Sequence, residues 1–238
     1  MRLVEKNRAI QVSRQNNSYY NGIAADYDFM LDKEASNKII RQKVADQFGS
    51  VVKRGRVLDF GGGTGLDIGW MTRNHYQISF CEPSFAMRKL AMERARNECP
   101  ASHISYMDES KTDFRNWSRS FPFESKVNAV LANFAVLNCI ADIDLVFEKI
   151  ALTLKTGGIF FALVLDSSFK KRMRSHGMET IQSLIFGKPV QIQVDYNGRH
   201  QLVYLHSYRG IRKALLPYFD LITCQHLEDF NLLQLKRK

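Results

Sequence analysis

The sequence has few cysteines and lacks any long apolar run. Its 238 residues include four cysteines, none in a CxxC pair, and their spacing suits neither a zinc knuckle nor a disulfide framework. No apolar run approaches the roughly 20 residues that a membrane-spanning helix requires. The positive charges near the N-terminus are not followed by the apolar block of a secretory signal. These absences predict a cytoplasmic protein without a membrane span, a structural disulfide or a bound metal.

Basic residues outnumber acidic ones. There are 34 Lys and Arg against 24 Asp and Glu, which gives a formal net charge of +10. Such an excess favours an anionic partner: nucleic acid, acidic lipid or a small anion. The densest basic runs, at residues 170–174 and 236–238, lack the interleaved aromatic residues that stack on bases. A scattered basic surface explains the charge equally well, so charge alone does not indicate RNA binding.

Strand and helix patterns alternate through the middle of the chain. This alternation, over residues 56–165, predicts an open α/β sheet with parallel core strands. Residues 1–17 are polar and basic, and we expect a loose arm or a helix that orders late. Beyond the sheet, alternating apolar residues on both sides of Asn197-Gly198 predict a β-hairpin. A helix over 207–219 and two closing strands, 221–227 and 232–235, are expected to follow.

A glycine-rich stretch, Asp59-Phe60-Gly61-Gly62-Gly63-Thr64-Gly65, lies between a predicted strand and a predicted helix. A phosphate-binding P-loop needs Gly-Lys-Ser/Thr, but Leu66 and Asp67 stand there, and Leu66 also breaks the GxGxxG pattern of dinucleotide sites. The pattern that remains is an acidic residue, Asp59, followed by GxGxG at Gly61, Gly63 and Gly65. Glycines let the backbone approach a ligand closely, and a carboxylate attracts a cation while repelling pyrophosphate. The stretch therefore predicts a site for a cationic, phosphate-free cofactor; a plain connecting turn is the alternative.

Polar residues also follow the neighbouring strands. Glu82 comes 21 residues after Gly61, where an acid can bind both hydroxyls of a ribose. Asp108-Glu109 follows a third strand and could accept from an adenine amino group, although a solvated loop acid fits as well. Asn133-Phe134 follows a fourth strand, and its oxygens could contact the amino-acid portion of the cofactor.

Together these motifs resemble those of the class I S-adenosylmethionine-dependent methyltransferases. The glycine-rich stretch resembles the family's first motif, Glu82 its second and Asp108 its adenine-contacting acid. Residues 133–137 resemble the fourth-strand motif, and residues 20–28 resemble the Y-x-x-x-A-x-x-Y-D segment of small-molecule methyltransferases, including those of quinone biosynthesis. The resemblance covers residues 19–230. Two positions depart from it: Asn128 replaces an Asp that is common in the fourth strand, and Phe219-Asp220 replaces the common Gly-Phe.

The resemblance implies a Rossmann-like seven-stranded sheet with helices on both faces and an antiparallel last strand. It implies an N-terminal segment, residues 1–31, that covers the substrate and cofactor, and a methyltransferase domain, residues 32–238, with a lid insertion at about 166–206. The implied cofactor is S-adenosyl-L-methionine, with S-adenosyl-L-homocysteine as product. The cofactor-binding residues expected on this basis are Tyr20, Tyr27, Asp59, Gly61, Gly62, Gly63, Glu82, Pro83, Asp108, Glu109, Asn133 and Phe134.

His206 is the expected catalytic base. It follows the second hairpin strand, directly before the last helix, and it shares strand parity with Leu202 and Tyr204. A structural histidine is the alternative. The apolar residues of the insertion are expected to close over the acceptor and exclude water: Phe169, Met173, Met178, Leu184, Ile185 and Phe186.

The predicted function is methylation of a small molecule, with a hydroxyl oxygen as the favoured acceptor, in cofactor or secondary metabolism. The basic surface suits an anionic or carrier-bound substrate. An RNA or protein methyltransferase is the first alternative, but the sequence lacks the Asn/Asp-Pro-Pro-Tyr/Phe motif of many amino-methylating enzymes. A non-catalytic partner subunit is the second, and the intact Asp59, glycine loop and Glu82 argue against it. The sequence does not indicate an oligomeric state.

Overall fold

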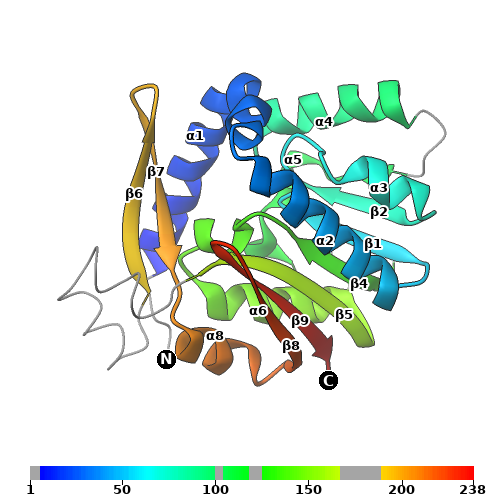
Figure 1. Ribbon diagram of the computed structural model, residues 1–238. Helices are drawn as coiled ribbons and strands as arrows, with labels where there is room; N and C mark the ends of the chain where they lie inside the picture. The colour runs from blue at the N-terminus through cyan, green and yellow to red at the C-terminus, as the bar shows by residue number, and fades with distance from the viewer. Residues whose placement is uncertain (1–5, 100–103, 118–124, 167–188) are drawn as a thin grey trace.

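The computed structural model describes residues 6–99, 104–117, 125–166 and 189–238. Seven strands form one sheet in the order β3-β2-β1-β4-β5-β9-β8 (Figure 1). Strands β1 to β5 pair in parallel, and β9 runs antiparallel to both β5 and β8. The predicted sheet with an antiparallel last strand is confirmed. The strands are Arg56–Phe60 (β1), Gln77–Cys81 (β2), Ile104–Tyr106 (β3), Val127–Ala132 (β4), Leu154–Leu165 (β5), Phe219–Leu227 (β8) and Phe230–Arg237 (β9).

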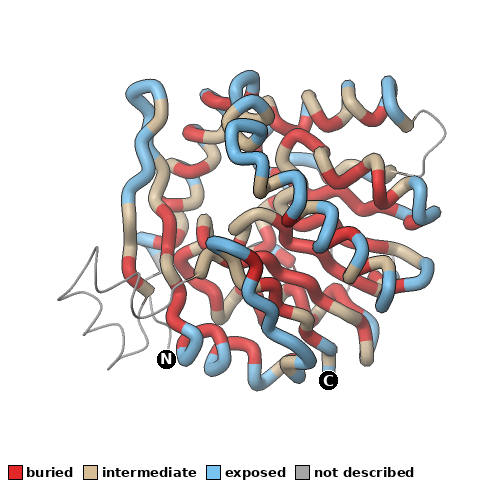
Figure 2. The backbone as a smooth tube through the Cα atoms, in the orientation of Figure 1, coloured by how far each residue is buried: buried red, intermediate tan, exposed pale blue. Residues whose placement is uncertain are grey.

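Helices cover both faces of this sheet. Alternate strand residues point to opposite faces, so Leu58 and Phe60 join one core cluster and Val57 joins the other. Figure 2 shows that the buried residues follow the central strands, whereas the outer faces of the helices are exposed. Helices α6 (Ile143–Thr153) and α8 (Tyr208–Leu215) cover the first face; α2 (Ala35–Val51), α3 (Ile68–Arg73) and α4 (Phe85–Glu98) cover the second.

The strand order reverses at β1, which pairs with β2 on one side and with β4 on the other. In open α/β sheets, ligands bind at the carboxyl ends of the strands at such a reversal. The glycine loop, Gly61–Gly65, follows β1; Glu82 follows β2; and Asn133 follows β4. The topology therefore places all three polar segments at the same edge of the sheet.

The N-terminal segment forms a long helix, α1 (Lys6–Asp32). Of the two alternatives expected for residues 1–17, a loose arm or a helix, residues 6–17 form the helix, and residues 1–5 lie outside the described ranges. The buried residues Ala9, Val12 and Tyr19 recur at helical spacing and pack α1 onto the rest of the protein. None of the helices in the described ranges combines the length and the apolar character needed to cross a bilayer.

The predicted hairpin is present as β6 (Val190–Tyr196) and β7 (Arg199–Leu205), a separate two-stranded sheet beside α1 (Figure 1). Its turn residues, Asn197 and Gly198, have φ values of 48° and 71°, as a tight hairpin turn requires. The apolar residues proposed for the lid lie in 167–188, outside the described residues.

One helix boundary differs from the prediction. Helix α8 ends at Leu215, before Pro217, and does not reach Phe219, which is the first residue of β8.

Candidate active site

A cavity of about 300 Å³ lies at the carboxyl ends of β1, β2 and β4. We call the part formed by the glycine loop, Glu82, Pro83, Asn133 and Phe134 the strand-end wall. The part formed by α1 is the helix wall, and it consists of Ser13, Arg14, Asn16, Asn17, Tyr20 and Tyr27. Nine of the predicted cofactor residues line the cavity: Tyr20, Tyr27, Gly61, Gly63, Glu82, Pro83, Glu109, Asn133 and Phe134.

The glycine loop brings bare backbone to this cavity. Gly61 has a φ of +75°, and a methyl group added there would lie 2.6 Å from the side chain of Val136. A larger residue at Gly61 would therefore meet both backbone strain and a steric clash. Gly63 also has positive φ, at +57°, but a methyl group added there would lie at ordinary distances of 3.8 and 3.9 Å from Tyr27 and Met87.

Glu82 connects this loop to α4. Its Oε2 accepts from the backbone N–H of Gly63 at 3.0 Å, and its Oε1 accepts from that of Ser84 at 2.7 Å. Burial raises the pKa of Glu82 to about 7, although both backbone hydrogen bonds lower it. An ionised carboxylate has about four acceptor positions, so Glu82 keeps capacity for two hydroxyl donors after these two bonds. The geometry fits the predicted ribose contact.

Asp59 and Gly62 lie behind the cavity lining. Asp59 is buried in β1, and its Oδ2 has no hydrogen-bond partner within the described residues. A methyl group added at Gly62 would lie 2.6 Å from that oxygen. Burial, followed by the charge of Asp67, raises the pKa of Asp59 well above its usual value, whereas Arg41 lowers it. The Oδ2 atom is thus a buried acceptor without a donor, and a cationic ligand nearby would favour the ionised form of Asp59.

The two acids after β3 are placed differently from each other. Asp108 is exposed and forms a 3.5 Å ion pair with Lys111, outside the cavity. Its neighbour Glu109, the first residue of α5 (Glu109–Thr112), lines the cavity. The geometry thus favours Glu109 over Asp108 as the group that meets a ligand.

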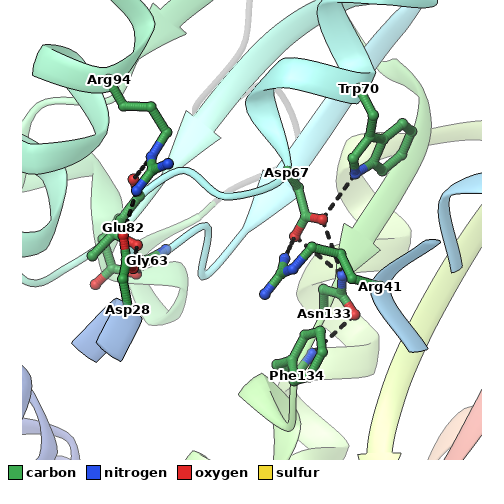
Figure 3. A network of polar contacts seen from close by, with 10 residues as sticks. Asp28, Arg41, Gly63, Asp67, Trp70, Glu82, Arg94, Asn133 and Phe134 are labelled. Atoms are coloured by element: carbon green, nitrogen blue, oxygen red, sulfur yellow. Dashed lines mark hydrogen bonds and ion pairs between the residues drawn. The ribbon is translucent and has the colours of Figure 1, made fainter. Parts of the chain in front are cut away.

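A polar network fastens the end of α1 to the glycine loop (Figure 3). Arg94 of α4 donates to the carbonyl oxygen of Thr64 at 3.0 Å and pairs with Asp28. The hydroxyl of Thr64 also donates to Asp28. Sequence reasoning missed this network, although Asp28 belongs to the segment that resembles small-molecule methyltransferases. Its effect is to hold the neighbouring Tyr27 over the loop.

A second network surrounds Asp67, on the other side of the loop (Figure 3). The Asp67 carboxylate is buried and accepts from Arg41 at 2.5 Å and from Trp70 Nε1 at 2.8 Å. It also accepts from the amide nitrogen of Asn133 at 3.1 and 3.2 Å. Sequence reasoning used Asp67 only to exclude a P-loop and did not single out Arg41, because apolar periodicity carries no information about the polar face of α2.

Directly after β4 the backbone adopts an uncommon conformation. Phe134 and Ala135 have φ values of 47° and 62°, in the left-handed region that non-glycine residues rarely occupy. The amide oxygen of Asn133 accepts from the N–H of Phe134 at 3.0 Å, and the N–H of Ala135 donates to the carbonyl oxygen of Leu163 at 2.9 Å. Such conformations cost of order 1 kcal/mol each and cluster at functional sites. Here the turn places Phe134 against the cavity.

The helix wall is fixed by Asn16. Its amide nitrogen donates to the carbonyl oxygens of Leu202 and Cys139, at 2.8 and 3.0 Å, and its oxygen accepts from the N–H of Leu202 at 2.9 Å. The next residue, Asn17, lines the cavity, and its Oδ1 is buried without a hydrogen-bond partner in the described ranges. Asn16 therefore sets the rotation of α1, and Asn17 offers an oxygen to a ligand that donates a proton.

Tyr20 and Cys139 meet across the cavity. The phenol oxygen lies 3.2 Å from the thiol sulfur. Burial raises the pKa of Tyr20 well above its usual value and that of Cys139 to about 11. Both groups are therefore protonated near neutral pH.

His206 does not line the cavity. It is buried, and its Nε2 lies 3.2 Å from the carbonyl oxygens of both Leu137 and Ile140. Because carbonyls only accept, Nε2 carries the proton in these contacts. Burial lowers the pKa of His206 to about 4. The expected role as base has no support in this geometry, which favours a structural role: His206 fixes the segment that carries Cys139 and Ile140.

Comparison with known proteins assigns the family. A sequence profile described as "Methyltransferase domain" matches residues 31–215, and the chain belongs to that family. No curated protein matches the sequence. The resemblance to class I S-adenosylmethionine-dependent methyltransferases is therefore confirmed, and with it the prediction of an enzyme.

Solved structures share the fold. One is 1,6-didemethyltoxoflavin-N1-methyltransferase of Burkholderia thailandensis, crystallised with 1,6-didemethyltoxoflavin and S-adenosylhomocysteine. It has 11% identity and a TM-score of 0.68, over 97% of this chain and 90% of that one. DhpI, in a complex with SAM and HEP, has 16% identity and a TM-score of 0.68, over 95% and 98%. CalS10 of Micromonospora echinaspora, an amino pentose methyltransferase with bound SAM, has 14% identity and a TM-score of 0.60, over 90% and 96%.

Proposed function

We propose that the protein transfers a methyl group from S-adenosyl-L-methionine to a small molecule. The observation that carries this proposal is one cavity with two walls: the strand-end wall suits a nucleoside, and the helix wall encloses the space beside it. A cavity of about 300 Å³ bounded by α1 suits a small acceptor better than a folded macromolecule. The names of two structural relatives, which describe methylation of didemethyltoxoflavin and of an amino pentose, point the same way.

The residues of the chain bind, orient and shield the reactants. When bound, the cofactor supplies an already activated methyl group on a sulfonium. Glu82 is placed to accept the ribose hydroxyls, and Asp59 attracts positive charge from behind the glycine loop. Tyr20 and Tyr27 cover the cavity from α1. Alignment of the acceptor with the methyl group then supplies several kcal/mol or more of barrier reduction.

We further propose a hydroxyl oxygen as the methyl acceptor. Such a group must lose its proton, and a positioned base contributes typically ~100- to 10,000-fold. Because His206 lies outside the cavity, we assign this role to Asp113, a lining carboxylate that is not among the expected cofactor contacts. Arg14 also lines the cavity, which supports an anionic or carrier-bound substrate. The domain limits and the cytoplasmic location stay predictions.

Methyl-labelled cofactor identifies the acceptor. The protein is incubated with the labelled cofactor and fractionated metabolites, before and after nuclease and protease treatment, and the products are analysed by mass. We expect a small product with one added methyl group that survives both treatments and is absent with the Glu82→Ala variant. Label found only in RNA or protein would overturn the small-molecule assignment. Cofactor binding with no labelled product in any fraction would instead favour a non-catalytic subunit.

A further inference from the structure

We propose that Arg41 is a positioning residue for the amino-acid portion of the cofactor. Its guanidinium group bridges Asp67 and the ring of Phe134 and thereby holds the left-handed turn after β4 in the shape that faces the cavity. This inference rests on the proposed function, because it requires that S-adenosylmethionine binds at the strand-end wall.

Arg41 makes two contacts at once (Figure 3). One terminal nitrogen lies 2.5 Å from Oδ2 of Asp67, and the guanidinium carbon lies 4.4 Å from the ring centroid of Phe134. The Asp67 side chain is 5% exposed and that of Arg41 19% exposed, so both contacts are largely shielded from water. Cation–π contacts are stronger when they are desolvated, and removal of one partner of a buried ion pair leaves an uncompensated charge.

These contacts form a closed ring of interactions. Arg41 binds Asp67, Asp67 accepts from the amide of Asn133, and Asn133 accepts from the backbone N–H of Phe134. The aromatic side chain of Phe134 contacts the guanidinium group of Arg41 and so closes the cycle. A turn with two consecutive left-handed residues persists only where contacts with the surrounding structure hold its conformation. The cycle of contacts through Arg41, Asp67 and Asn133 provides such support.

The position of the turn indicates which part of the cofactor it meets. Strand β1 separates β2 from β4, and neighbouring strands lie about 4.8 Å apart. The ends of β2 and β4 are therefore about 10 Å apart, on opposite sides of the glycine loop. With the ribose at Glu82, the cofactor extends across Asp59 toward the turn at Phe134, and its amino-acid end is the part that reaches the turn.

The charge of Arg41 also acts on this end of the cavity. Asp59 and Asp67 are both buried carboxylates, and Arg41 opposes the rise in the pKa of Asp59. Removal of Arg41 would leave these acids without the cation and the turn without the stacked guanidinium. The expected consequence is local: ligands that reach the turn are affected, and ligands that end at the ribose are not.

Two ligands separate these effects. S-adenosylhomocysteine carries the amino-acid portion, and 5′-methylthioadenosine lacks it. Calorimetry with the full-length protein gives both dissociation constants. We expect Arg41→Met to weaken S-adenosylhomocysteine binding about tenfold or more and to change 5′-methylthioadenosine binding less than about twofold. Arg41→Lys should weaken S-adenosylhomocysteine binding by an intermediate amount, because lysine keeps the charge but not the planar stacking group. Arg73→Met, on the exposed end of α3, is the control and should change neither.

A second variant guards against misfolding. Phe134→Leu removes the aromatic ring but leaves the pair of Arg41 with Asp67, and we expect it to weaken S-adenosylhomocysteine binding selectively as well. Equal weakening of both ligands by Arg41→Met and Phe134→Leu, or no weakening of either, would overturn the positioning role. Failure of the wild-type protein to bind either ligand would overturn the proposed function itself.

Discussion

The strand-end wall and the helix wall enclose the same cavity but are held by different kinds of contact. In the strand-end wall, the Glu82 carboxylate bonds Gly63, 19 residues away, and backbone geometry fixes the loop. In the helix wall, Asn16 bonds Cys139 and Leu202, which are 123 and 186 residues away. The strand-end wall therefore depends on short motifs at strand ends, whereas the helix wall depends on side chains that meet only when the chain is folded.

The largest effect is expected from Gly61→Ala in the strand-end wall. The added methyl group would lie 2.6 Å from Val136 on a backbone with positive φ, so the free energy of unfolding should fall by about 3 kcal/mol. Gly198→Ala is the matched control: its φ is also positive, at +71°, but nothing lies within 4 Å, and the loss should be about 1 kcal/mol. Urea denaturation measures both. Equal losses would show that strain alone, without the contact to Val136, makes glycine necessary.

Glu82→Ala tests the same wall through binding. It removes a buried charged acceptor, so the dissociation constant of S-adenosylhomocysteine should rise about 100-fold, the loss expected for hydrogen bonds to a charged group. Glu82→Gln keeps an acceptor oxygen, so its affinity for S-adenosylhomocysteine should fall less. Calorimetry gives both constants. An unchanged constant in Glu82→Ala would remove the ribose contact from the proposed site.

Asn16→Ala tests the helix wall. It deletes three hydrogen bonds to the backbone of residues 139 and 202, and the unfolding free energy should fall by about 2 kcal/mol. S-adenosylhomocysteine affinity should change less than about threefold, because the strand-end wall is intact. Asn17→Ala, one position along α1, is the control and should leave stability nearly unchanged. A large loss of cofactor affinity in Asn16→Ala would show that the two walls are not separable.

The smallest effect concerns His206 and pH. Its pKa is lowered from 6.5 to about 4 in the folded protein, so the neutral ring contributes stability above pH 6.5, and this contribution is lost as the pH falls toward 4. Unfolding free energies of the wild type and His206→Gln, measured between pH 4 and 7, should converge at the acid end. For a structural histidine, the pH profile of turnover at saturating substrate should keep its shape in the variant. Loss of the acid limb from that profile, where turnover falls as a base is protonated, would restore His206 as the base.

The sequence predicted the strand-end wall better than the helix wall, for a physical reason. Parallel strands end at a common edge, so residues that follow a strand, such as Gly61, Glu82 and Asn133, can be placed from topology alone. The continuous apolar runs of the central strands likewise predict that helices cover both faces of the sheet. The direction of a side chain after a strand ends does not follow: Asp108 and Glu109 are adjacent, yet only Glu109 lines the cavity.

The prediction for His206 shows the same limit. It assumed that strand parity continues from Leu202 and Tyr204, but β7 ends at Leu205. Beyond that point the ring stacks on Tyr204, at a centroid distance of 6.3 Å, and contacts carbonyl oxygens 66 and 69 residues earlier in the chain. Arg41 was missed for a related reason. Its partners, Asp67 and Phe134, lie far from it in the sequence, and no local sequence pattern predicts these contacts.

The amide of Asn16 imitates a peptide group, since it offers Leu202 both a donor and an acceptor. Helix α1 is in this way attached to β7 much as a neighbouring strand would be. The far end of the same helix is tied to the glycine loop through Asp28. The hairpin and the glycine loop, which lie far apart in the sequence, are therefore joined through the two ends of one helix.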